Sequence, residues 1–250
     1  MDQRIIFLPL LIISNIVISA WWYQRPQDML WLSIALVVIN VFSAWWLGRS
    51  RKDWWIFSLL PLFLLLSGLS YSLMFGQQFL ALGIISISTL GSILYWRLVF
   101  LYAFRQGAFR PFSLEKSSNY LSLLTIFFST ASIFGLKIFI DLPLWQLLSA
   151  AVITNLAVIT QWLWFEKIVW RTHWIYGVLM FLALLEFYIV FSFLPINFHI
   201  LGFSMAVMWY ALSTIVSDQL SGHPSSARAR FVLIITLVAT LAVLLTARWF

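Results

Sequence analysis

Long apolar stretches that carry almost no charge make up most of this 250-residue chain. Each is close to the roughly 20 residues that a helix needs to cross a hydrocarbon core about 30 Å thick. Overall, 63% of the residues are hydrophobic and 9% are charged, whereas soluble domains contain about 25% charged residues. A soluble fold cannot bury that much apolar surface. The sequence therefore predicts an all-α polytopic integral membrane protein, a helix bundle with eight or nine transmembrane helices.

The apolar stretches divide into nine predicted spans. They cover residues 5–22, 29–47, 54–75, 79–103, 120–140, 144–164, 174–193, 198–216 and 231–249. Helices are favoured because the runs are too long for barrel strands and because a helix satisfies its own backbone hydrogen bonds in lipid. The shortest break lies at residues 194–197, where Pro195 and Asn197 favour a tight hairpin. One continuous helix through this break would reduce the count to eight.

Lysine and arginine alternate between the breaks that separate the spans. Ten lie in the even breaks, namely Arg49, Arg51, Lys52, Arg105, Arg110, Lys116, Lys167, Arg171, Arg228 and Arg230. The odd breaks contain only Arg25. Basic loops stay on the cytoplasmic side, so the even breaks and the N-terminus are predicted to face the cytoplasm. Nine spans then place the C-terminus outside the cell membrane, and the basic loops should contact anionic lipid headgroups on the cytoplasmic face.

No loop is long enough for a soluble domain, so residues 1–250 are predicted to form a single transmembrane domain. The longest loops cover residues 104–119 and 217–230. The net charge of +7 comes largely from loop residues beside the spans, which favours lipid headgroups over nucleic acid as the partner. With no cysteine, the chain cannot form disulfides, thiolate nucleophiles or cysteine-ligated metal sites.

Motifs that carry catalytic or cofactor chemistry are missing from the sequence. We find no G-x-x-x-x-G-K-[ST], H-E-x-x-H or G-x-S-x-G pattern, and none of the 8 acidic residues lies within four positions of another. The sequence therefore predicts no catalytic residue, no cofactor and no metal site. Asp141, Asn197 and His199 could together bind a cation near the outer surface, but ordinary surface polarity is the favoured explanation of that trio.

Aromatic pairs mark many of the predicted span edges. These are Trp21 with Trp22, Trp45 with Trp46, Trp54 with Trp55, Tyr95 with Trp96, and Trp162 with Trp164. Rings of this kind commonly sit at headgroup depth. We interpret the tryptophans as interfacial anchors rather than as a cofactor or sugar site.

Lys137 and Glu186 are the most costly residues inside the predicted spans. At 1.5 Å per residue they lie about 25 Å and 18 Å from the inner face on two helices of the same direction. An intramembrane charge costs at least about 2.5–3.5 kcal/mol on insertion scales, so opposite charges at similar depth are expected to be neighbours. We favour an ion pair that joins the two helices, or a lysine that reaches the outer surface. A proton or substrate site with Glu186 is the alternative.

Asn15, Asn40 and Asn155 form a second polar group, because each lies ten or eleven residues into its span. This places all three near the bilayer midplane. Such amides most often bond across pairs of helices, each bond contributing about 0.6–2 kcal/mol. The other interpretation is a polar cavity that the amides line together with Glu186, so these residues and Lys137 are the candidate substrate-binding set.

One resemblance concerns the break Phe193-Leu194-Pro195-Ile196-Asn197-Phe198-His199-Ile200-Leu201-Gly202 and the tryptophan-rich helices around it. This part of the chain resembles uncharacterised polytopic membrane proteins of candidate-phyla bacteria. The resemblance covers mainly the second half of the chain and implies no particular activity.

Three classes of function fit these observations. A non-enzymatic role is favoured, either as a small-solute or proton-coupled carrier or as an accessory subunit that packs against another membrane protein or a second copy. The alternative is an intramembrane enzyme that acts on a lipid-linked substrate, with Glu186 or His199 as acid or base. A hydrated cavity at Glu186 would indicate a carrier, a dry core an accessory subunit, and a cleft with convergent titratable groups an enzyme.

Overall fold

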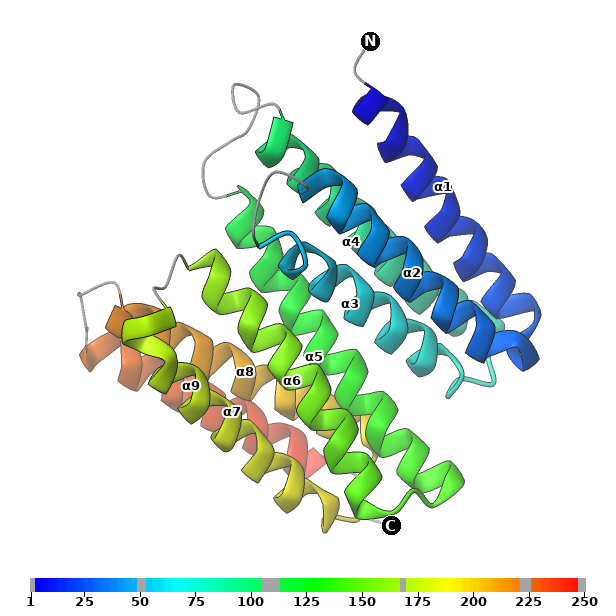
Figure 1. Cartoon of the computed structure of the whole chain (residues 1–250). Coiled ribbons are helices and arrows are strands. Elements are labelled where there is room, and N and C mark those ends of the chain that lie inside the picture. Colours follow the sequence, from blue (N-terminus) through cyan, green and yellow to red (C-terminus); the bar gives the residue numbers. More distant parts are fainter. Residues whose placement is uncertain (1–2, 49–52, 105–112, 167–169, 221–225, 247–250) are drawn as a thin grey trace. The chain divides into compact units, whose positions relative to one another are not determined.

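The structure, a computed structural model, describes residues 3–48, 53–104, 113–166, 170–220 and 226–246, and these residues are almost entirely helical (Figure 1). A short 3-10 turn, η1 (Pro26–Asp28), follows the first of nine α-helices in the described ranges. The helices are α1 (Gln3–Gln24), α2 (Met29–Gly48), α3 (Ile56–Ser72), α4 (Gln78–Phe104), α5 (Ser113–Ile140), α6 (Leu144–Phe165), α7 (Trp170–Ser192), α8 (Phe198–Leu220) and α9 (Ser226–Thr246). The all-α prediction is confirmed.

Helix bounds follow the apolar runs closely, and the hairpin predicted at Pro195 is confirmed because α7 ends at Ser192 and α8 begins at Phe198. The largest difference is at α5, which begins at Ser113 rather than at position 120. Its first turn contains Glu115, and an acidic residue favours the N-terminal end of a helix. The polar residues before the apolar run therefore extend this helix instead of forming a loop.

Six helices in the described ranges are long and apolar enough to cross a membrane. They lie in α2, α4, α5, α6, α7 and α8, while α3 and residues 229–242 of α9 are apolar but shorter. The fold therefore fits a polytopic membrane protein. The count of nine spans and the orientation of the termini stay predictions. The basic residues 49, 51, 52, 105, 110 and 167 lie outside the described residues, as do the side chains of Arg171 and Arg228.

The chain divides into two compact units, residues 1–122 and residues 123–250. In the first, α1 packs on α2, α2 on α3, α3 on α4 and α4 on α1, which closes an up-and-down four-helix arrangement. Its core contains Trp22, Leu36, Leu65, Leu69 and Ile85. Helix α3 is buried along most of its length, serines included, which fits a helix enclosed by neighbours rather than by lipid.

In the second unit, α6 packs on α7, α7 on α8 and α8 on α9. Gly202 of α8 lies against α5, where a Cβ added to the glycine would come within 2.9 Å of Ala131 Cβ and of Phe127 O. Small residues of this kind let two helix backbones approach closely, as is common where membrane helices pack. Trp162 of α6 and Trp209 of α8 meet edge to face, with ring centroids 6.3 Å apart.

The aromatic pairs do not all lie at the surface of their units. Trp22, Tyr95, Trp96 and Trp162 are buried inside their units, with exposed fractions of 3%, 0%, 0% and 1%. These rings therefore pack against protein, and their position at headgroup depth stays a prediction. The lengths of the apolar runs place these rings near the edges of the predicted spans. In the structure the helices turn the rings toward neighbouring helices, where a large ring buries more apolar surface than at a lipid boundary.

Candidate functional site

Asn15 and Asn40 meet in the interior of the first unit, and both are fully buried. The Asn40 amide nitrogen donates to Leu36 O at 2.8 Å and lies 3.5 Å from Asn15 Oδ1. The Asn40 carbonyl oxygen accepts the Trp96 indole N–H at 3.1 Å, and the Asn15 amide donates to Leu11 O at 3.1 Å. This network joins α1, α2 and α4 and uses its donors within the protein. It can align three helices, but it presents no polar group to a ligand.

Asn155 lies in the other unit and is also fully buried. Its amide approaches the Tyr188 hydroxyl, but neither its nitrogen nor its oxygen makes a hydrogen bond of ordinary geometry. The Tyr188 hydroxyl instead pairs with the Thr130 hydroxyl, and the Tyr188 ring stacks on Phe134 with centroids 5.8 Å apart. This interior joins α5, α6 and α7, and Asn155 is enclosed in it.

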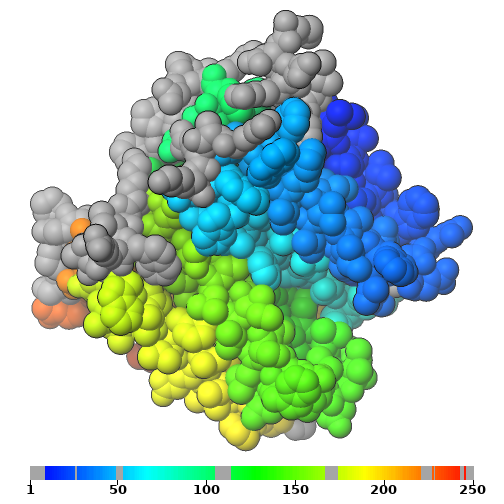
Figure 2. Space-filling view, viewed as in Figure 1, coloured from blue at the N-terminus to red at the C-terminus, as the bar shows by residue number. Residues whose placement is uncertain are grey.

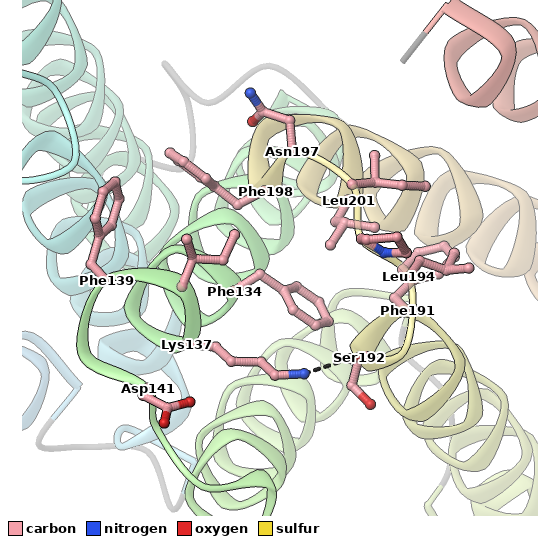
Figure 3. A pocket seen from close by; sticks show the side chains of 13 residues that line it. Phe134, Lys137, Phe139, Asp141, Phe191, Ser192, Leu194, Asn197, Phe198 and Leu201 are labelled. Carbon is pink, nitrogen blue, oxygen red and sulfur yellow. Dashed lines mark hydrogen bonds between the residues drawn. The ribbon is translucent and has the colours of Figure 1, made fainter. Parts of the chain in front are cut away.

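The expected ion pair between Lys137 and Glu186 does not form, and this prediction is wrong. The Lys137 ammonium donates to the backbone carbonyl of Ser192 (Figure 3). Glu186 is exposed on α7, and within the described part of the chain it makes no hydrogen bond or ion pair. Tyr188, two positions further on, faces α5, and two positions correspond to a turn of about 200° on a helix. Glu186 therefore points away from the helix that carries Lys137.

Glu186 lies instead near the middle of an exposed, mostly apolar stripe that runs along α7 and ends at Phe193, the residue after the helix. The stripe repeats at intervals of three and four residues and consists of Ile175, Leu179, Leu182, Glu186, Ile189 and Phe193. Figure 2 shows side chains of α7 (yellow) at the surface of the second unit. We call the six residues named above, from Ile175 to Phe193, the α7 stripe. Its spacing is that of helix-to-helix packing, in which residues at i, i+3, i+4 and i+7 share one face.

Lys137 lines a pocket of about 590 Å³ at one end of the second unit. The pocket lies between the last turn of α5 and the link from α7 to α8, and Figure 3 shows these segments around it. Most of its wall is apolar, and its rings are Phe134, Phe139, Phe191 and Phe198. The Lys137 ammonium and the Asp141 carboxylate are the charged groups of the lining. The pocket can therefore hold an apolar body that carries a polar end.

In the trio Asp141, Asn197 and His199, the asparagine has a local structural role. The Asn197 carboxamide oxygen accepts the backbone N–H of His199 at 3.0 Å, so its side chain caps the start of α8. Among the described residues no group of three or more histidine or acidic side chains could hold a metal ion.

The structure thus brings Asn15 together with Asn40 in the first unit. In the other unit, Asn155 lies in the interior, Glu186 on an exposed helix face and Lys137 in a pocket. Of the candidate residues that the structure describes, Lys137 lines a pocket and Glu186 lies on an exposed helix face, so both are open to a partner. Sequence reasoning missed the aromatic lining of the pocket, because those rings gather only when α5, α7 and α8 converge. It also missed Trp96 as the donor to Asn40, although a tryptophan with a buried N–H does need an acceptor.

Comparison of the chain with family models, with curated proteins and with solved structures gives no match. Its class therefore follows from its own helices: an all-α protein with six helices, in the ranges described, that are long and apolar enough to cross a membrane.

Proposed function

We propose that this protein is a non-enzymatic accessory subunit of a membrane complex, which docks through the α7 stripe onto a transmembrane helix of a different protein. The observation that carries the proposal is the position of Glu186. An acidic side chain is exposed near the middle of an apolar helix and has no partner among the described residues of its own chain.

A Glu186 carboxylate that faces lipid is less stable than one that contacts a partner. A charged side chain at the centre of a membrane helix costs about 2.5–3.5 kcal/mol on insertion scales when it faces lipid. Intramembrane charges therefore face protein, water or an opposite charge. Helix α7 turns Glu186 away from its own core, so a neighbouring protein is the remaining source of such contacts.

The chemistry of the partner follows from the charge. A carboxylate is stabilised by a basic or hydrogen-bond-donating side chain at matching depth. A second copy that docked symmetrically through the same stripe would place its own Glu186 against this one, and like charges at close range repel. We therefore assign the stripe to a different protein whose transmembrane helix carries Lys, Arg, His, Asn or Gln.

The placement of the three asparagines supports an accessory subunit over a carrier. A carrier holds its substrate at a polar site near the midplane that both sides of the membrane can reach in turn. Asn15 and Asn40 are instead enclosed in one unit and Asn155 in the other, and Glu186 lies with neither group. An intramembrane enzyme that used Glu186 would need a second titratable group beside it, and the α7 stripe offers none among the described residues.

Exchange of Glu186 for leucine tests this proposal. We expect the tagged full-length chain, extracted from its native membranes in mild detergent, to migrate as a complex with a second polypeptide. E186L should release most of the chain as a lone species, whereas E186Q should retain part of the complex because glutamine still accepts hydrogen bonds. Native mass spectrometry measures the fraction of chain in the complex.

Glu115 supplies the control, because E115Q removes one negative charge from the first turn of α5 and leaves the α7 stripe intact. E115Q should leave the complex unchanged. Two results contradict the proposal: a complex that persists undiminished in E186L, or a wild-type species whose mass is a multiple of this chain alone.

A further inference from the structure

The pocket at Lys137 is a second place where the protein can bind a molecule, and it does not depend on the α7 stripe. It lies where α5 ends at Ile140 and where α7 and α8 join. The ends of apolar helices of this length lie at headgroup depth, because the helices match the hydrocarbon thickness. A molecule in the pocket therefore has its polar part at the membrane surface and its apolar part beside the helices.

Lys137 is half-buried and has donors to spare. A lysine ammonium has three N–H donors, and the structure uses one of them on the Ser192 carbonyl. That hydrogen bond fixes the direction of the side chain into the pocket (Figure 3). The remaining donors are suited to an oxygen anion such as a phosphodiester, which lysine binds as a point charge.

The Asp141 carboxylate also lines this pocket. Asp141 is exposed, has a backbone φ of 54°, and follows the last residue of α5. Glycine and asparagine suit this left-handed position after a helix, whereas a negative charge at a helix C-terminus is unfavourable. No ion pair with Lys137 compensates it in the described structure, although Lys137 lies only four positions earlier in the chain. The carboxylate is therefore open to a cationic group in the pocket.

From these features we propose that the pocket binds a phospholipid whose headgroup carries both a phosphodiester and a primary ammonium, the chemistry of phosphatidylethanolamine. The phosphate oxygens accept from Lys137, and the ammonium donates to Asp141. The aromatic rings of Phe134, Phe191 and Phe198 hold the first part of an acyl chain. The two opposite charges of the pocket match the two opposite charges of the headgroup.

Other lipids match the pocket less completely. A choline headgroup has the same phosphate, but its quaternary nitrogen has no N–H to donate to Asp141. A phosphatidylglycerol headgroup has the same phosphate but ends in a neutral glycerol, so it has no positive charge to match the Asp141 carboxylate. The pocket should therefore rank the ethanolamine lipid first, and removal of the carboxylate should abolish that ranking.

Lipid retention by the full-length protein tests the proposal. The purified chain is exposed in detergent to equal amounts of phosphatidylethanolamine, phosphatidylcholine and phosphatidylglycerol, and native mass spectrometry measures which lipid it retains. Wild type should retain the ethanolamine lipid preferentially. K137Q should lower its retention by about tenfold, since a charge-assisted hydrogen bond is lost. D141N, in which asparagine suits the left-handed backbone, should bring ethanolamine and glycerol lipids to equal retention.

Two controls separate this site from general lipid binding. K116Q removes the same charge from the opposite end of α5, where Lys116 is exposed, and should leave retention unchanged. E186L should also leave lipid retention unchanged. The experiment therefore distinguishes an error in the proposed α7 contact from an error in the proposed lipid site. Water-soluble glycerophosphoethanolamine tests whether the headgroup alone is the ligand and should compete poorly. The proposal is overturned if wild type shows no lipid preference, if K137Q retains the lipid as wild type does, or if the soluble headgroup competes as well as the lipid.

Discussion

Replacement of Gly202 with leucine should lower the free energy of unfolding by about 3 kcal/mol, at the upper end of the cost of overfilling a packed interior. Even a single added carbon would come within 2.9 Å of Phe127 O and of Ala131 Cβ. The first of these atoms is backbone, so the contact cannot be relieved by a change of rotamer. Helices α5 and α8 must separate, and the contacts around them are lost. Reversible unfolding in mixed micelles measures the change.

Gly83 is the matched control, since it also lies in a helix but a Cβ added there meets no atom within 4 Å. Gly83→Leu should leave the free energy of unfolding unchanged or raise it slightly, because leucine favours helix more than glycine does. Equal losses for the two variants would show that the α5 and α8 contact is not as close as described.

The substitutions Asn40→Leu and Asn155→Leu should change the free energy of unfolding differently, although both remove a fully buried asparagine from a similar predicted depth. In Asn40→Leu the Trp96 indole N–H loses its acceptor while it remains buried. An unsatisfied buried donor costs about 1–3 kcal/mol, and we expect a loss within that range. In Asn155→Leu no ordinary hydrogen bond is lost, and two unpaired polar atoms are removed. Its free energy of unfolding should stay the same or rise.

The same unfolding measurement compares the two variants. Asn40→Gln serves as the control for the amide, because a longer side chain that still carries an acceptor should recover part of the loss. A larger loss for Asn155→Leu than for Asn40→Leu would contradict the contacts assigned to the two residues.

The helices themselves were predictable from the sequence because the length of an apolar run is a one-dimensional signal. The starts of α6 and α8 fall at Leu144 and Phe198, as the runs indicate. Pro195 and Asn197 marked the hairpin between α7 and α8, since neither residue favours continuation of a helix there. The early start of α5 was missed because its first residues are polar. A helix that extends beyond the hydrocarbon core does not need an apolar surface there.

The direction in which each side chain points was not predictable. Depth along a helix follows from 1.5 Å per residue, so Lys137 and Glu186 could be placed at similar heights. Rotation about the helix axis needs an amphipathic pattern, and α7 is apolar on nearly every side. Without such a pattern, nothing in the sequence distinguishes a glutamate that faces α5 from one that faces outward.

The prediction of the candidate site lacked the same information about the direction of side chains. The sequence grouped Asn15, Asn40 and Asn155 by depth, and the structure separates the last of these from the other two. Lys137 was identified from its charge, but its pocket depends on rings that come together from α5, α7 and α8. Contacts between distant segments of this kind have no signature in a single apolar sequence.

Photo-crosslinking along α7 tests most directly whether Glu186 faces a protein partner. A photoreactive residue is placed in the full-length chain in native membranes at Leu179, Leu182 or Ile189 on the α7 stripe, and at the exposed positions Leu82 and Leu90 of α4 as controls. We predict that the stripe positions form an adduct with a different polypeptide whose crosslinked segment carries a basic or amide side chain, that E186L abolishes this adduct, and that the α4 positions label lipid. Labelling of lipid alone at all five positions, or adducts that E186L leaves unchanged, would contradict the account.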